Sequence, residues 1–280
     1  MMTFTSPKAD LYIPDSLAED VALSRTTHLG VGAHQDDLEF MALHGILECF
    51  QRPDQWFGGV TCTDGAGSAR TGPYADFTDE DMKQVRATEQ RAAAVVGQYS
   101  FIAQLGHPSS VAKNDHQRSS MVDDLVAILK ATQPKVVYTH NPFDKHATHI
   151  GVFKALLAAI QHLPDAERPQ QLIGCEVWRG FDWLPDHLKL VLSLDAHPNL
   201  AASLNGVFDS QIVGGKRYDL AVEGRRLANA TFFDAHTTDV AQRVAYALDM
   251  SELMSGEVAL QDFCQRILNA FNQEILDGLT

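Results

Sequence analysis

Residues 27–39 read THLGVGAHQDDLE, and this stretch decides the fold. Apolar and small residues over 27–33 predict a buried strand, and helical periodicity over 38–50 predicts the helix that follows it. The polar residues between them therefore stand where a strand ends and a helix begins. In an open parallel sheet, ligands bind outside this carboxyl edge of the strands. The stretch thus predicts a strand–helix unit with a candidate site at its turn.

Short apolar runs continue to alternate with amphipathic runs along the chain. Strands are predicted over 56–63, 101–105, 135–139, 173–177 and 190–194, and helices over 79–96, 121–131 and 149–160, with a mainly helical pattern from residue 200 onward. This order predicts an α/β fold, a Rossmann-like layered sandwich with a mainly parallel central sheet and a helical C-terminal extension. We expect one domain over 1–280, with a core of about 27–235 and the extension over about 236–280.

The composition excludes several classes of function. The 280 residues carry a formal net charge of −14, which disfavours a nucleic-acid partner and an anionic membrane surface. No run approaches the ~20 apolar residues of a membrane span, and the N-terminus lacks the apolar core of a signal peptide, so a cytoplasmic location is expected. The four cysteines form no C-x-x-C pair, and neither a G-x-G-x-x-G nor a Walker A motif is present.

The first group of candidate functional residues is His34, Asp36 and Asp37 at the end of the first strand. Histidine nitrogen and carboxylate oxygen are ligands suited to zinc and similar divalent ions. A second carboxylate beside such a ligand could take a proton from water held by the metal. An alternative is that the two aspartates cap the following helix, although this would not explain His34.

The second group lies in residues 140–149, which read HNPFDKHATH and follow the strand predicted over 135–139. His146 and His149 are three residues apart and share one face if the segment is helical. One of them could complete a metal site with three protein ligands and an open position, as in catalytic zinc sites. Exposed surface histidines are the alternative interpretation, but both groups follow strands at the same sheet edge.

At these two groups the sequence resembles the PIG-L/LmbE-like N-deacetylase family. The first hallmark of that family, Ala-His-Pro-Asp-Asp-x-Glu, is matched by residues 33–39 with Gln35 in place of proline. The second, Asp-x-His-x-Asp-His, is matched by residues 144–149 with Thr148 in place of aspartate. Three shorter segments are also similar to the family: Thr63-Asp64-Gly65, Arg86-Ala87-Thr88-Glu89 and Asp209-Ser210-Gln211. The resemblance spans about residues 27–235.

The resemblance implies a set of roles. It implies that His34, Asp37 and His149 bind one divalent metal, with zinc as the expected ion, while Glu39 supports the site. Asp36 is implied as the general base, and His146 as the group that stabilises the oxyanion or protonates the leaving amine. The implied reaction is removal of an N-acetyl group from an N-acetylglucosaminyl-type sugar or a related amide.

Thr148 is the departure with the larger expected consequence. The family aspartate can orient His146 and favour its protonated form, whereas a hydroxyl does so less well. Asp144, Asp115 or another acid would have to substitute for it. The sequence therefore leaves open a hydratase or lyase acting on a small unsaturated acid, and a catalytically silent protein that binds a sugar or metal.

Other side chains are weaker candidates. Arg70 and Lys145 lie in the two loops that carry the motifs, and they are expected either to bind substrate or to be solvated surface charges. Trp178 is expected in the core or an interface rather than as a platform for a sugar, and His140 as a possible neighbour of the ligands. A small sugar or glycoconjugate is the expected partner, and the apolar helix over 258–279 could pack on a second copy or on its own core.

Overall fold

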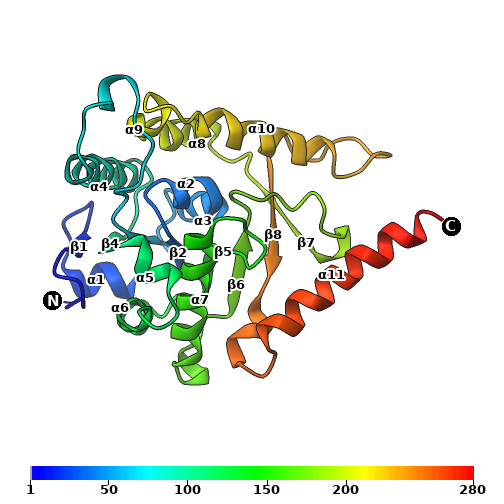
Figure 1. Cartoon of the computed structure of the whole chain (residues 1–280), viewed down its shortest axis with the longest axis horizontal. Coiled ribbons are helices and arrows are strands. Elements are labelled where there is room, and N and C mark those ends of the chain that lie inside the picture. The colour runs from blue at the N-terminus through cyan, green and yellow to red at the C-terminus, as the bar shows by residue number, and fades with distance from the viewer. Residues whose placement is uncertain (1) are drawn as a thin grey trace.

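The computed structural model describes residues 2–280, and one eight-stranded sheet runs through the middle of the molecule (Figure 1). The strands are β1 (Asp10–Tyr12), β2 (His28–Gly32), β3 (Phe57–Thr63), β4 (Phe101–His107), β5 (Val136–His140), β6 (Gln171–Cys175), β7 (Lys189–Ser193) and β8 (Val244–Asp249). Their order across the sheet is β1-β4-β3-β2-β5-β6-β8-β7. The five central strands from β4 to β6 are parallel, while β1, β8 and β7 are antiparallel to their neighbours.

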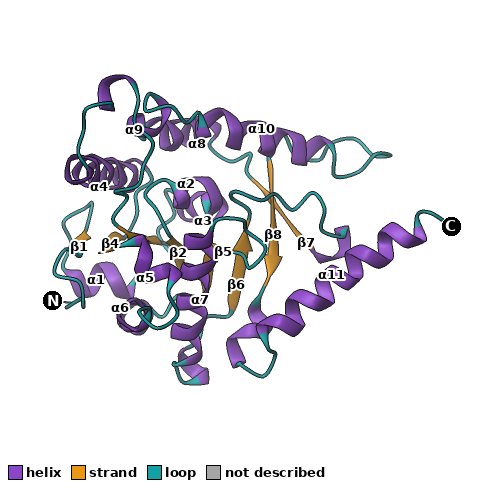
Figure 2. Ribbon diagram, in the orientation of Figure 1, coloured by secondary structure: helices purple, strands orange, loops and turns teal. Residues whose placement is uncertain are grey.

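Helices cover both faces of the sheet (Figure 2). The α-helices are α1 (Glu19–Ser24), α2 (Asp37–Met41), α3 (Leu43–Cys49), α4 (Asp79–Val96), α5 (Ser109–Lys113), α6 (Ser119–Thr132), α7 (Ala147–Gln161), α8 (Pro198–Gly206), α9 (Asp209–Ile212), α10 (Tyr218–Thr231) and α11 (Leu260–Asp277). One apolar core joins the sheet to α6, α7 and α11, and the other joins it to α3, α4 and α8. The predicted layered α/β sandwich with a mainly parallel sheet is thus confirmed.

Two local differences from the predicted pattern have visible causes. The helix predicted over 38–50 is broken at Ala42 into α2 and α3. At this break the buried guanidinium of Arg226 donates to the carbonyls of Glu39 and Phe40 at 3.0 and 3.1 Å. The predicted C-terminal helical extension contains a strand, β8, because Val244–Asp249 pairs with both β6 and β7.

The C-terminal helix α11 extends away from the sheet at the end opposite the N-terminus (Figure 1). Phe263 and Ile267 on its inner face are buried in the core, whereas Ile275 and Leu276 are about half exposed. Within residues 2–280, no helix combines the length and apolar character that crossing a membrane would require.

Candidate metal centre and pocket

The turn after β2 is built around Asp36, whose backbone has the left-handed φ of 92°. A non-glycine residue in this region is strained, and such strain is commonly held at functional sites. Here the amide of Asp36 donates to Oε1 of Gln90 at 3.1 Å, and Arg86 donates to the carbonyl of Gln35. The carboxylate of Asp36 makes no capping hydrogen bond to α2, so the helix-cap interpretation does not describe it.

Asp37 meets two imidazoles at the centre of this turn. Nδ1 of His34 lies 3.3 Å from Oδ2 of Asp37 and 3.2 Å from Nε2 of His149. Nε2 of His149 lies 3.5 Å from the other carboxylate oxygen of Asp37, Oδ1. Ligands held 2.0–2.1 Å from a tetrahedral zinc ion stand about 3.3 Å apart, so the contacts among these three side chains have the spacing of such a site. We call these three side chains the ligand cluster.

A fourth histidine, His140, lies behind the ligand cluster. Its ring stacks on His149 at 3.9 Å between centroids, and its Nε2 lies 3.3 Å from Oδ2 of Asp37. By distance, two sets among the described residues could hold an ion: His34, His146 and His149, and Asp37, His140 and His149. However, Nε2 of His140 already accepts a hydrogen bond from the amide of Ala33 at 2.9 Å, and all three side chains of the second set are buried. A catalytic ion needs an open position, which favours a set that includes His34.

Asp144 supports the ligand cluster from the second motif. Its Oδ2 lies 3.2 Å from Nδ1 of His149, and its Oδ1 accepts from the amide of His146 at 2.9 Å. A carboxylate on the far nitrogen of a ligating histidine fixes the tautomer and orientation of that ring. Among the described residues, Asp144 is therefore engaged with the ring of His149 and with the backbone of His146, not with the ring of His146.

The ring of His146 is instead held by Trp178, which lies just beyond the end of β6. The two rings stack at 5.9 Å with an interplanar angle of 17°. Thr148, which replaces the family aspartate, is buried, and its hydroxyl has no hydrogen-bond partner among the described side chains. Burial, followed by the neighbouring His149 and His34, lowers the pKa of His146 to about 4. A neutral imidazole can still donate its N–H group.

Asp36 has the electrostatic environment of a base. Burial raises the pKa of its carboxyl above the usual range, and the guanidinium of Arg86, 3.3 Å from Oδ2, opposes that rise. By contrast, burial acts against Asp37 but is outweighed by His149 and His140, so the pKa of Asp37 is lowered well below its usual value. Two adjacent carboxylates thus differ in basicity, as is typical of a pair that divides ligand and base roles.

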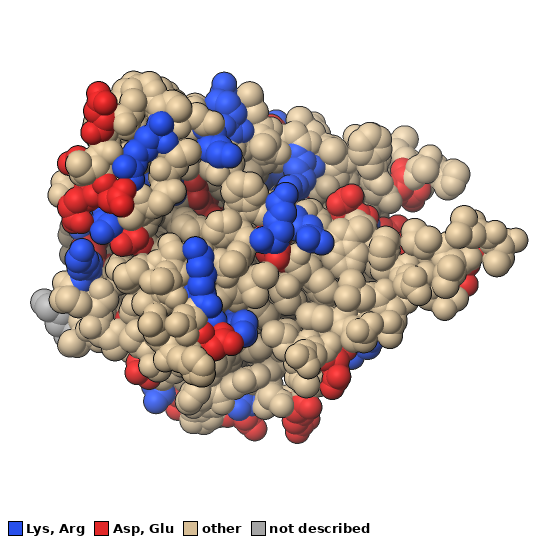
Figure 3. Space-filling model, in the orientation of Figure 1, with Lys and Arg blue, Asp and Glu red and all other residues tan. Residues whose placement is uncertain are grey.

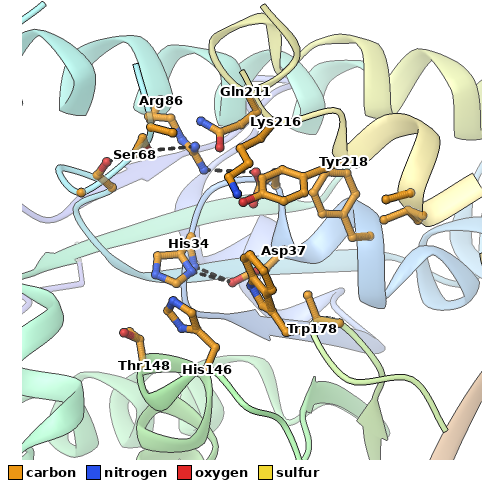
Figure 4. Close-up of a pocket in the computed structure, with 18 of the residues that line it drawn as sticks. His34, Asp37, Ser68, Arg86, His146, Thr148, Trp178, Gln211, Lys216 and Tyr218 are labelled. Atoms are coloured by element: carbon orange, nitrogen blue, oxygen red, sulfur yellow. Dashed lines mark hydrogen bonds and ion pairs between the residues drawn. The ribbon is translucent and has the colours of Figure 1, made fainter. Parts of the chain in front are cut away.

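A pocket of about 520 Å³ opens directly onto these residues (Figure 4). His34, Asp36, Asp37, His146 and Thr148 line its floor. Its walls come from other parts of the chain: Gly65, Gly67, Ser68 and Ala69 after β3, Arg86 on α4, Ser109 and Lys113 on α5, Val177 and Trp178 after β6, and Gln211, Lys216, Tyr218, Ala221, Val222 and Arg225 around α9 and α10. The late segment is anchored to α4, because the amide and hydroxyl of Ser210 donate to Glu89 at 2.7 and 2.6 Å.

The structure places the two weaker candidates differently. Arg70 does not line the pocket, and its guanidinium binds the carbonyls of Ala66 and Phe77 and the carboxylate of Asp79. Lys145 does not line the pocket either, but its Nζ lies 5.8 Å from the ring of Trp178, which does. Their contacts with a substrate remain predictions.

Several wall residues were missed or misplaced by sequence reasoning. Trp178 was expected in the core or an interface, but it is 37% exposed and forms part of the wall. Its position just after a parallel strand was the available signal. Lys216 and Tyr218 follow no strand, and no pattern in the sequence indicates their place.

Comparison with known proteins finds a family that matches part of the chain. Residues 29–160 match the family described as PIG-L, GlcNAc-PI de-N-acetylase. No curated protein sequence matches the chain.

Solved structures resemble it over most of its length. The conserved protein TT1542 from Thermus thermophilus is 18% identical, with a TM-score of 0.61, and the match covers 80% of this chain and 94% of that one. The 4-carboxy-2-hydroxymuconate hydratase GalB from Pseudomonas putida KT2440 is 17% identical, with a TM-score of 0.62 and coverage of 80% and 96%. The N,N'-diacetylchitobiose deacetylase from Pyrococcus horikoshii is 14% identical, with a TM-score of 0.64 and coverage of 85% and 88%. At these identities the likeness shows a shared fold.

Proposed function

Over residues 29–160 the chain belongs with the PIG-L/LmbE-like proteins, and on that premise we propose that it is a metal-dependent deacetylase. Its substrate would be an N-acetylglucosaminyl-type sugar or a related amide. The observation that carries the proposal is the convergence of nitrogen and oxygen atoms from His34, Asp37 and His149 at 3.2–3.5 Å, beside an open pocket that His34 and Asp37 line. Family membership and the deacetylase among the similar folds support the reaction class.

One divalent ion, with zinc as the first candidate, would be held by His34, Asp37 and His149. When bound, such an ion lowers the pKa of water and polarises a carbonyl oxygen. The nitrogen and oxygen donors suit zinc and other first-row ions. Asp144 would keep the ring of His149 in the ligating orientation through its contact with Nδ1.

Asp36 would accept the proton of the attacking water. Its raised pKa lets it hold that proton and return it to the amide nitrogen as the C–N bond breaks. Water thus supplies one oxygen of the acetate that forms. The amine leaves with the proton that Asp36 took from that water. Arg86, 3.3 Å away, opposes the rise in the pKa of Asp36 and so favours the ionised carboxylate that the reaction needs.

His146 would donate its N–H group to the oxyanion of the tetrahedral intermediate. Its lowered pKa favours this role over protonation of the leaving amine, because the imidazole enters the reaction neutral. Stacking on Trp178 holds the ring in place and so takes over the orienting role expected of the family aspartate.

Acetate release tests the proposal. The purified protein is incubated with N-acetylglucosamine, its oligomers and its glycoconjugates, before and after chelation and after zinc is restored. We expect acetate and a free amine that disappear with chelation and return with zinc. Metal-dependent hydration of an unsaturated dicarboxylate without acetate release would instead make the protein a hydratase. Metal binding with neither reaction on these substrate panels would favour a silent binding protein.

A further inference from the structure

The mouth of the pocket is lined with cations although the chain as a whole is acidic. The lining holds four basic side chains and only two carboxylates, Asp36 and Asp37, both on the floor. The whole chain has 36 acidic and 22 basic residues. Figure 3 shows basic side chains gathered around the hollowed centre of this face. Arg86 forms an ion pair with Asp36. Among the described residues, the other basic side chains around the pocket form no ion pair with a carboxylate.

Three lysines at or beside the pocket come from three separate segments: Lys113 and Lys216 line it, and Lys145 lies next to the lining residue Trp178. Lys113 ends α5, Lys145 lies before α7, and Lys216 lies between α9 and α10. All three are exposed. None of them forms an ion pair in the described part of the chain, whereas Lys83, Lys154 and Lys189 are each paired with an acid.

Two of these lysines lie close to the ring of Trp178, near the proposed reaction centre. Nζ of Lys145 and Nζ of Lys216 lie 5.8 and 5.9 Å from its ring, and the same ring stacks on His146. Lys216 reaches from its loop into the pocket above His34 and Asp37 (Figure 4). The backbone of that loop is fixed, because the amide of Lys216 donates to the carbonyl of Gln211 at 2.8 Å.

The geometry points to a substrate that carries an anionic group, a phosphate or a carboxylate, beside the amide that is cleaved. This inference rests on the proposed function and specifies its substrate class. The amide would lie on the floor, and the anion would lie between Lys216, Lys145 and Lys113. Unpaired ammonium groups around a concave site attract anions and bind them with charge-assisted hydrogen bonds. A neutral sugar could accept hydrogen bonds from these lysines through its hydroxyls but would leave their charges uncompensated.

Binding of product analogues tests the site without relying on turnover. The protein is titrated calorimetrically with glucosamine, glucosamine 6-phosphate and muramic acid, so that neutral, phosphate and carboxylate forms of one sugar are compared. We expect at least one anionic form to bind about tenfold more tightly than glucosamine, since one charge-assisted hydrogen bond contributes roughly that factor. Lys216→Gln should remove most of the preference. Lys130→Gln, an exposed lysine on α6, is the matched control and should leave it unchanged.

Turnover of the corresponding N-acetyl sugars separates this inference from the proposed function. Lys216→Gln should raise KM for the anionic substrate about tenfold with kcat almost unchanged, a much larger rise in KM than for the neutral substrate. Equal binding of all three sugars, or equal losses on neutral and anionic substrates, would overturn the anion site while leaving deacetylation intact. Anion binding that depends on Lys216, in the absence of any acetate release, would keep the site and reject the deacetylase.

Discussion

Two groups of buried histidine and aspartate side chains lie at the same edge of the sheet. One is the ligand cluster of His34, Asp37 and His149. The other joins His107, at the end of β4, to Asp124 on α6 and to Thr5 near the N-terminus. We call this second group the N-terminal clamp. Both pair an imidazole with a carboxylate about 3 Å away, so residue types alone do not distinguish them.

The difference lies in which side chains face a cavity, because Oδ2 of Asp37, like the carboxylate of Asp124, accepts hydrogen bonds within the protein, from the amides of Ala33 and His34 at 3.0 and 2.7 Å. Oδ1 of Asp124 accepts from the amide of Thr5 at 2.6 Å, and Oδ2 meets the hydroxyl of Thr5 at 2.8 Å and Nε2 of His107 at 2.9 Å. The clamp is therefore complete within the protein. In the ligand cluster, nitrogen and oxygen atoms of His34, Asp37 and His149 lie 3.2–3.5 Å apart, and His34 and Asp37 line an open pocket. Polar atoms that converge beside a cavity indicate a ligand-binding role. Polar atoms that hydrogen-bond only within the protein, away from a cavity, indicate a structural role.

Removing the base should have the largest effect. Asp36→Asn keeps the size of the side chain but cannot accept a proton, so kcat should fall about 10³-fold, as for the loss of a general base. Metal content, measured by mass spectrometry on the purified protein, should stay near that of the wild type. Asp123→Asn, an exposed neighbour of the clamp, is the control. Undiminished turnover in Asp36→Asn would mean that another group is the base.

Removing the oxyanion donor should have the next largest effect. His146→Phe keeps a ring that can stack on Trp178 but has no N–H group, so kcat should fall about 10²-fold. KM and the thermal midpoint should change little. If His146 instead protonated the leaving amine, the loss would shrink for substrates with better leaving groups, so comparing an N-acetyl sugar with an activated aryl acetamide separates the two roles.

The part of the site that depends on residues close together in the sequence could be predicted. His34, Asp36 and Asp37 follow a strand, and His146 and His149 begin the helix after another. Parallel pairing of β2 with β5 then brings the two turns together. Contacts that depend on distant segments could not be predicted. The stack of Trp178 on His146 and the position of Lys216 follow from how β6 and α10 pack, which no local pattern encodes. His107 also lies at the end of a strand, but its hydrogen bond to Asp124 gives it a structural role.

The clamp predicts a change in stability without a change in chemistry. Asp124→Asn removes a charge that receives hydrogen bonds from His107 and Thr5, and it should lower the free energy of unfolding by about 1–3 kcal/mol. The measurement is denaturant unfolding, with Asp123→Asn on the same helix as the control. At a temperature where both variants are folded, kcat should match the wild type. A fall in kcat like that of Asp36→Asn would break the distinction between the two groups.

The same carboxylate gives the clamp a dependence on pH. Burial acts against the ionised form of Asp124, but the hydrogen bonds from His107 and Thr5 outweigh it, so its pKa in the folded state is lowered. A lowered pKa stabilises the fold above the ordinary aspartate value of about 3.9, and this contribution is lost as the pH falls through the folded value. The unfolding free energies of wild type and Asp124→Asn should therefore converge below about pH 4. A difference that stays constant down to the acid limit would assign the effect to packing instead of charge.

The smallest effect should come from the ring that holds His146. In the clamp a carboxylate fixes the imidazole, whereas in the pocket Trp178 does so by stacking at 5.9 Å. Trp178→Leu should lower kcat about fivefold, because a ring contact of this kind contributes roughly 1 kcal/mol. Trp178→Phe keeps a stacking ring and should recover most of the loss. If the leucine and phenylalanine variants are equally impaired, the orientation of His146 does not depend on stacking, and the unpartnered hydroxyl of Thr148 becomes the next group to test.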